Sequence, residues 1–332
     1  MAAISMFVGG YIFWVSRVRM KSYYRLDNLD EPKSATQAQP VTNNVAYHDF
    51  PFIGTKALEF GLFRTYAIPS ISKILVSTKE LTDHCAQRYD DTDLIVREFM
   101  EQRVDSWRAT LAIRRLNALH GKYKISNEDY LYVLAIFAVI PYRWIDMYGY
   151  RPAHSLEKLS SYVFWNEVGS KMGIKDIPSS YEELELYMDD FEVKNMRFHP
   201  NNAHLAVSTL ELLLSPLPSI LHPIGREIVY AMCDRPLRAA MGFPDPIFGL
   251  SEALHSILVM SGWVTRILLP PRLVPARRTP YCPFDNQTEP VMGTRLCPVY
   301  NPYEATYKEG YCIEQLGPKK YVEEKELGEL YA

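Results

Sequence analysis

The sequence predicts an all-α fold, with one large helical domain between an uncharged N-terminal segment and an irregular C-terminal arm. Apolar residues recur at helical spacing along the middle of the chain, and prolines such as Pro141 fall between these stretches as terminators. Strand-type alternation is weak. The 332 residues, 48% of them hydrophobic and 23% charged, have a globular composition. The expected helices cover 92–105, 106–122, 127–140, 155–172, 180–194, 201–214, 222–233 and 249–268.

The first element is a run without charge over residues 2–15, AAISMFVGGYIFWV, followed at once by Arg17, Arg19 and Lys21. About 20 apolar residues are needed to span a bilayer, so this run would cross only where the membrane thins or neighbouring residues are drawn in. A cleavable signal peptide carries its positive charge before the apolar run, whereas these cations follow it. The order predicts a single-pass anchor over residues 1–21 with the rest of the chain in the cytosol. The alternative is a buried N-terminal segment.

Composition divides the rest of the chain into three parts. Residues 22–48 are polar and predict a linker, and residues 49–270 carry the helical signals of the main domain. Residues 271–332 are rich in Pro, Tyr and Cys and predict the irregular arm. The five cysteines lack a CxxC pair, which favours a reducing compartment. A disulfide in the arm is the alternative if it is lumenal, where Asn286 of the sequon NQT would also be glycosylated. The cysteines are Cys85, Cys233, Cys282, Cys297 and Cys312.

Charge and motifs exclude several classes of function. The net charge of −3 and the pI of about 6.3 give no basic excess for nucleic acid. The sequence has no GxGxxG, GxxxxGK[ST], HExxH or GxSxG motif, which argues against the dinucleotide, P-loop, zincin and serine-hydrolase classes. Aromatic residues make up 13% of the chain, which suits a large apolar core or a pocket for a hydrophobic ligand.

One histidine occupies a position where a helix expects a core residue. In RATLAIRRLNALH, residues 108–120, His120 continues an apolar stripe through Ala112, Ile113 and Leu116. Such a histidine is either a core residue bonded to a backbone carbonyl or a ligand of something bound. Neutral imidazole is a good axial ligand for haem iron, and arginines commonly meet haem propionates.

Arginines that could serve a ligand lie close to His120 in the sequence. Arg114 and Arg115 are one to two turns upstream of the histidine. Arg88 and Thr92 share one helical face at a spacing of four residues, in RYDDT about thirty residues earlier. His84 shares that face with Arg88 and is a weaker candidate for a second iron ligand.

Three stretches carry a resemblance to a known family: RYDDTDLIVREF, then RRLNALHGKYKISNEDYLYVLAIFAVIPYRWIDMYGYRP, then FWNEVGSKMGIKDIPSSYEELELYMDDFE. Together they resemble the fungal ER-bound oxygenases typified by MpaB, which are distantly similar to the latex-clearing rubber oxygenases. The resemblance covers roughly residues 80–245. It implies a globin-like helical core that binds haem b, with His120 as the iron ligand and Arg88 and Thr92 beside the haem. Arg114 is expected to help bind the cofactor.

The chain departs from the rubber oxygenases at one position. Where the rubber enzyme carries a lysine just before the Thr, able to occupy the distal iron position, this chain has Asp91. A lysine-capped iron is therefore not expected here. The glutamate proposed as a base in the rubber enzymes has no identifiable counterpart, since the sequence before residue 80 is too divergent.

The expected function is a membrane-bound haem b oxygenase that uses O2 to cleave a C=C bond in a prenyl or other lipophilic chain, in fungal secondary metabolism at the endoplasmic reticulum. Two alternatives stay open: an oxygenation of other regiochemistry, and a haem or lipid carrier without turnover. The need for a reductase partner is not determined. Trp144 and Trp165 are expected as core aromatics or channel walls, and Arg143 and Arg151 as surface charges.

Overall fold

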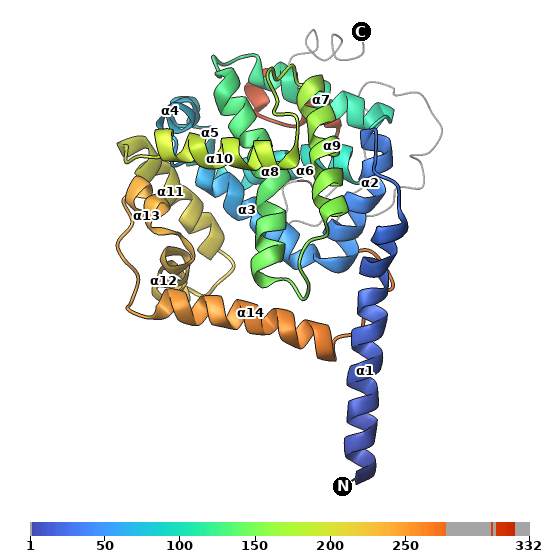
Figure 1. Cartoon of the computed structure of the whole chain (residues 1–332). Helices are drawn as coiled ribbons and strands as arrows, with labels where there is room; N and C mark the ends of the chain where they lie inside the picture. The colour runs from blue at the N-terminus through green and yellow to red at the C-terminus, as the bar shows by residue number, and fades with distance from the viewer. Residues whose placement is uncertain (1, 277–306, 308–309, 323–332) are drawn as a thin grey trace.

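The computed structural model describes residues 2–276, 307 and 310–322, and those residues form helices without any strand, which confirms the all-α prediction (Figure 1). The helices are α1 (Ala2–Arg25), α2 (Ala35–Asn44), α3 (Pro51–Thr65), α4 (Pro69–Thr78), α5 (Glu80–Asp83), α6 (Cys85–Met100), α7 (Trp107–His120), α8 (Asn127–Tyr148), α9 (Ser155–Lys171), α10 (Tyr181–Asn195), α11 (Pro200–Leu214), α12 (His222–Met232), α13 (Arg235–Met241) and α14 (Leu250–Leu268). Short 3-10 or π turns lie at Leu26–Asn28, Val45–Asp49, Ser219–Leu221, Ile313–Gln315 and Lys319–Tyr321.

Helix α8 forms the centre of the core. The Ser126 side chain caps its first turn by accepting from the Asp129 amide at 3.1 Å. The helix packs against α3, α9 and α10, and Gly61 of α3 leaves room for the Ile136 side chain, because a Cβ there would lie 2.7 Å from the Ile136 Cγ2 atom. Pro141 was expected to end this helix, but α8 continues through it to Tyr148. Burial of the helix on several sides outweighs the one backbone hydrogen bond that a proline removes.

Among the described residues, α8 alone has the length and apolar composition of a membrane-crossing helix, and 56% of that stretch is buried inside the protein. Burial of that kind is typical of a core helix in a globular domain. The N-terminal part of helix α1 instead extends away from the body of the molecule (Figure 1), whereas Val15, Arg19 and Met20 in its second half are buried against the body. The N-terminal anchor therefore stays a prediction that rests on sequence and on this projecting position.

Part of the expected linker is an ordered helix. The Ser34 side chain caps α2, and Ala35 and Ala38 are buried where α2 packs on α9. The Gln39 amide donates to the carbonyls of residues 99, 100 and 102 and accepts from the Val104 amide at 3.0 Å. Small and polar residues look like linker in a sequence, yet they allow close helix contact and satisfy the carbonyls at the end of another helix.

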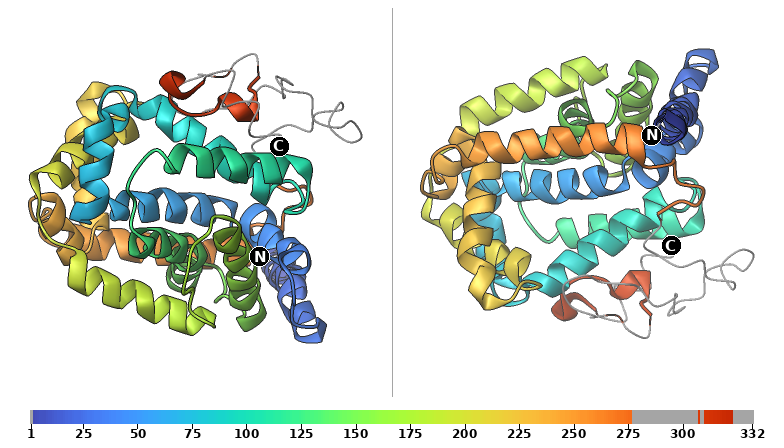
Figure 2. Two further views of the ribbon diagram at one scale, coloured as in Figure 1. Left: turned by 90° about the horizontal axis from the view of Figure 1, so that it is seen from above. Right: turned by 90° about the horizontal axis from the view of Figure 1, so that it is seen from below.

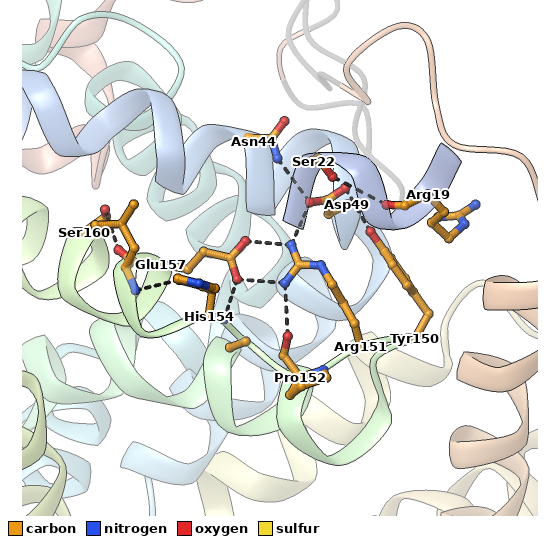
Figure 3. Close-up of polar contacts among 12 residues, drawn as sticks. Arg19, Ser22, Asn44, Asp49, Tyr150, Arg151, Pro152, His154, Glu157 and Ser160 are labelled. Atoms are coloured by element: carbon orange, nitrogen blue, oxygen red, sulfur yellow. Dashed lines mark hydrogen bonds and ion pairs between the residues drawn. The ribbon is translucent and has the colours of Figure 1, made fainter. Parts of the chain in front are cut away.

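Arg151 also differs from expectation, because it is buried rather than on the surface (Figure 3). Its guanidinium makes two hydrogen bonds to the Glu157 carboxylate, at 2.6 and 2.8 Å, and one to Asp49 at 2.8 Å. Tyr150 donates its hydroxyl to the other oxygen of Asp49 at 3.0 Å. Bidentate pairing is the geometry in which a buried arginine compensates for lost hydration.

Aromatic rings enclose this ion pair. The Arg151 guanidinium carbon lies 4.7 Å from the centre of the Tyr23 ring and 5.0 Å from that of Phe50. Tyr23 belongs to α1, and Phe50 is the residue that precedes α3. The cluster therefore joins the end of α1, the turn before α3 and the start of α9 at one point.

We expect Arg151→Met to lower the free energy of unfolding by about 3–5 kcal/mol, because it leaves Asp49 and Glu157 as buried carboxylates without their cation. The control is Arg143→Met. Arg143 also forms a two-carboxylate cluster, but its side chain is 29% exposed, so its loss should cost less than about 1 kcal/mol. Urea denaturation in detergent measures both variants, and equal losses would contradict a special role for the buried cluster.

Candidate functional site

A cavity of about 680 Å³ lies inside the helical body, within the 300–1,000 Å³ range of cofactor and ligand sites. Helices α3, α6, α7 and α8 form most of its wall, and α4, α9, α11, α12 and residues 317–321 complete it. The lining is mainly aliphatic and aromatic, including Phe60, Phe63, Phe99, Phe137, Trp144 and Trp165. Trp144 and Trp165 were expected either as core aromatics or as channel walls. Both pack in the core and also line the cavity. The space suits a large, flat or elongated apolar molecule.

His120 lies on the wall of this cavity, in the last turn of α7. Its Nδ1 atom is buried and makes no hydrogen bond, and its ring centre lies 5.6 Å from that of Tyr130. Burial lowers the pKa of His120 from 6.5 to about 4, so the ring is neutral at pH 7. A core histidine would have its nitrogens bonded to backbone groups. A neutral imidazole with a free nitrogen on a cavity wall has the properties that a metal ligand needs.

Arg88 and Thr92, on α6, line the same cavity. Arg88 pairs with Asp91 through Nη2 at 2.8 Å, whereas its Nε and Nη1 atoms are buried without a hydrogen bond. The Thr92 hydroxyl donates to the Arg88 carbonyl at 3.0 Å. Glu80 lies 3.8 Å from Nε, an ion pair too long for a hydrogen bond, so Arg88 has spare donors for an anionic group in the cavity.

Asp91, which stands where the rubber enzyme has lysine, is buried on the cavity wall. It accepts a hydrogen bond from the Tyr307 hydroxyl as well as pairing with Arg88. Burial raises its pKa, and Arg88 and Tyr307 oppose that rise. The position therefore carries a carboxylate held by a cation and a phenol from the C-terminal arm.

Arg114 does not join the other predicted residues. It is exposed and is not part of the cavity wall, whereas its neighbour Arg115 is buried. Arg115 donates to the carbonyls of Leu316 at 2.8 Å and Tyr321 at 3.1 Å, which holds the C-terminal arm against α7. His84 is exposed at the start of α6 and also lies off the wall. The structure thus brings together His120, Arg88 and Thr92.

A second polar group on the wall was not anticipated from the sequence. Glu59 of α3 pairs with Lys56 at 2.7 Å and accepts a hydrogen bond from the Tyr89 hydroxyl at 2.8 Å. All three residues line the cavity. In the sequence, Lys56 and Glu59 have the spacing of an ordinary surface pair, and nothing connects them with Tyr89 of α6. This group gives the apolar wall a second place where a polar part of a ligand could be bound.

The C-terminal arm closes one side of the cavity. Gly317, Pro318 and Tyr321 line it, and the Tyr321 hydroxyl lies 3.0 Å from that of Tyr123. Cys312 is buried, and Cys85 and Cys233 are free thiols. Cys282, Cys297 and Asn286 lie outside the described residues, so the alternatives of an arm disulfide and a glycan stay predictions.

The sequence profile of the family described as "ER-bound oxygenase mpaB/B'/Rubber oxygenase, catalytic domain" matches residues 67–276. The chain belongs to this family. Membership makes it an oxygenase, and the matched segment contains Arg88, Thr92 and His120. The resemblance seen in the sequence motifs is thereby confirmed.

Relatives from the genus Penicillium agree with this assignment. The chain is 33% identical over 276 residues to "ER-bound oxygenase mpaB'" of Penicillium brevicompactum, covering 78% of this chain and 65% of that protein. It is 32% identical over 245 residues to "ER-bound oxygenase mpaB" of Penicillium roqueforti (strain FM164), covering 68% of this chain and 82% of the relative. The chain thus spans about two thirds of the first relative's length.

The lowered pKa of His120 gives a prediction about stability. Between pH 6.5 and about 4 the native protein binds fewer protons than the unfolded chain, so the free energy of unfolding should fall as the pH falls through this window. His120→Phe removes that contribution and should flatten the dependence in cofactor-free protein. Urea denaturation at several pH values measures it, with His84→Phe at an exposed site as the control. An unchanged slope in His120→Phe would show that the ring is solvated.

Proposed function

We propose that this oxygenase binds haem b in the cavity, where His120 would be a ligand of the iron. The observation that carries the proposal is the neutral imidazole on the wall of a large apolar cavity, with its Nδ1 atom unbonded. The ligands that haem iron accepts in proteins include histidine, methionine, cysteine and tyrosine. Among the cavity residues described above, His120 is the one whose chemistry fits best. When bound, the haem would supply the oxygen chemistry.

The remaining wall residues have separate roles in this proposal. The two unbonded nitrogens of Arg88 would bind a haem propionate, the kind of planar carboxylate that guanidinium recognises. Thr92 places a small polar group beside Arg88. The aromatic wall excludes water and would hold a lipophilic chain in one orientation, which is how a protein scaffold favours attack at one bond. Arg114 is exposed, and this position does not support a role in binding haem.

We further propose that the reaction is oxidative cleavage of a C=C bond in a prenyl or other lipophilic chain, in fungal secondary metabolism of the meroterpenoid kind. The apolar cavity supports a lipophilic substrate, and the Penicillium relatives are named as ER-bound oxygenases. The enzyme would be held at the endoplasmic reticulum by α1, with its domain in the cytosol. A product with an unbroken carbon skeleton would contradict cleavage, and bound haem without oxygen-dependent turnover would favour a carrier.

His120→Ala tests the cofactor. We expect the variant to lose most of its bound haem, with an affinity lower by more than about tenfold, since even outer residues of a metal site change affinity by 10–100-fold. The Soret band and the pyridine haemochrome spectrum measure haem, and far-UV circular dichroism shows whether the fold is kept. His84→Ala is the matched control. Full haem retention in His120→Ala would remove this residue from the ligand role.

Arg88→Ala tests the propionate contact. Hydrogen bonds to charged groups are worth about 1.5–3 kcal/mol, so its loss should weaken haem binding by about tenfold or more. Arg114→Ala is the control on the neighbouring helix, and it also tests the expectation from sequence that Arg114 binds the cofactor. A haem titration followed by absorbance measures both. If Arg114→Ala weakens binding and Arg88→Ala does not, the assignment of the two arginines is reversed.

A further inference from the structure

Two neighbouring helices, α12 and α14, expose a set of large apolar side chains. We call this set the lower apolar face, and its members are Ile220, Ile224, Ile228, Ile257, Met260, Trp263, Val264 and Leu268. On α12 and the turn before it, the three isoleucines recur every four residues, so they form one stripe. Of the 19 residues of α14, Gly262 is the buried one. An apolar helix that is covered on so little of its surface indicates a partner.

Gly262 explains how α14 is attached. A Cβ at this position would lie 2.6 Å from the Tyr148 carbonyl oxygen and 2.8 Å from that of Gly149, so the glycine lets α14 cross the end of α8 in close contact. Figure 2 shows α14 running across the underside of the body. The rest of the helix keeps its apolar side chains exposed.

The charges on α14 lie near its two ends. Between Glu252 and Arg266 the helix has no acidic residue, lysine or arginine. Arg266 lies over the Trp263 ring, with 5.9 Å between the guanidinium carbon and the ring centre, and the exposed Arg272 follows. An apolar face bordered by tryptophan and arginine is typical of helices that lie in the headgroup region of a bilayer.

Helix α1 points to the same side. The Tyr11 hydroxyl donates to the Leu268 carbonyl at 2.9 Å, and Arg19 donates to the Leu269 carbonyl at 2.6 Å. Beyond Tyr11, α1 continues past α14 and away from the body (Figure 1), with Met6 and Phe7 exposed. The nine-residue rise from Ala2 to Tyr11 is about 14 Å at 1.5 Å per residue. This length is close to half of a hydrocarbon core about 30 Å thick.

We propose that the lower apolar face is a second membrane-binding surface, in which α14 lies in the headgroup region of the leaflet that α1 enters. The occupant is a lipid bilayer rather than a second protein for two reasons. The face adjoins the uncharged projecting end of α1 through the contacts of Tyr11 and Arg19, and Met6 and Phe7 on that end are exposed among the residues that the structure describes. The relatives are also named as ER-bound.

The surface also borders the cavity. Ile228 is 40% exposed on the lower apolar face and lines the cavity, as do Val229 and Met232 beside it on α12. Helix α12 is therefore a thin partition between the proposed bilayer surface and the proposed haem site. Resting on the proposed function, we place the entry of the lipophilic substrate here, where it leaves the bilayer without crossing water.

The test uses the full-length protein and vesicles of phosphatidylcholine, phosphatidylethanolamine and phosphatidylinositol. Met260→Glu/Val264→Glu places two charges on the face and should weaken the affinity for vesicles at least about tenfold, even with α1 intact, because it removes two apolar side chains from lipid. The matched control is Leu186→Glu/Val193→Glu, two exposed apolar residues of α10 that lie off the face. Flotation in a density gradient measures binding, and far-UV circular dichroism checks folding.

A second measurement places the helix directly. Lipids brominated on the acyl chain should quench tryptophan fluorescence in the wild type. Trp263→Phe should reduce this quenching, and the reduction should be larger than the one caused by Trp14→Phe. The proposal is overturned if Trp263 is not quenched, or if both double variants bind vesicles equally. It is also overturned if Met260→Glu/Val264→Glu only dissociates a dimer. Vesicle binding does not depend on haem. If the wild-type protein floats normally with vesicles but has no Soret band, that result counts against the proposed function and leaves the membrane-binding surface intact.

Discussion

The buried ion pair between Arg151 and Glu157 is the constraint on which the arrangement of the N-terminal half depends. Arg151 contacts Asp49 in the turn before α3, and it packs against Tyr23 of α1 and Phe50 at the start of α3. Separating any of these segments would leave a charge in a low-dielectric interior without its partner. The helix that the cluster positions most directly is α3, which packs along α8 and supplies one wall of the cavity. The cluster thus sets the spacing of helices that have no direct charge contact with it.

Two sets of polar side chains at the cavity are held by hydrogen bonds and ion pairs within a wall that is mainly apolar. One set is formed by Arg88, Asp91 and Tyr307, with His120 on the same wall, and the other by Lys56, Glu59 and Tyr89. Desolvation acts on both signs of charge, because it lowers the pKa of His120 and raises that of Asp91. The atoms left unbonded, on Arg88 and His120, mark where a ligand would complete the first set.

The proposed bilayer surface and the proposed haem site have complementary positions in the fold. The C-terminal arm covers the cavity at α6 and α7 through Arg115 and the tyrosines, and α12 separates it from the lower apolar face. One side of the cavity is therefore closed by hydrogen-bonded polar groups and the other by a single apolar helix. This asymmetry would give a lipophilic substrate one route of entry, past the apolar helix α12. On the other side, hydrogen-bonded polar groups of the C-terminal arm separate the cavity from solvent.

The sequence by itself indicated eight of the helices, α6 to α12 and α14, and it singled out the candidate residues that line the cavity. The expected helix 106–122 is α7 (Trp107–His120), and the apolar stripe placed His120 correctly on an inward face, because helical periodicity is a local property. The four-residue spacing of Arg88 and Thr92 placed both on the cavity wall for the same reason.

Tertiary structure decided the rest. Arg114 and Arg115 differ by one helical step of about 100°, and only packing selects which one is buried. Arg151 is buried against Asp49, which lies 102 residues away in the chain. Tyr89 contacts Glu59, which lies 30 residues away. Such pairings depend on how whole helices pack, which no local pattern of residues encodes.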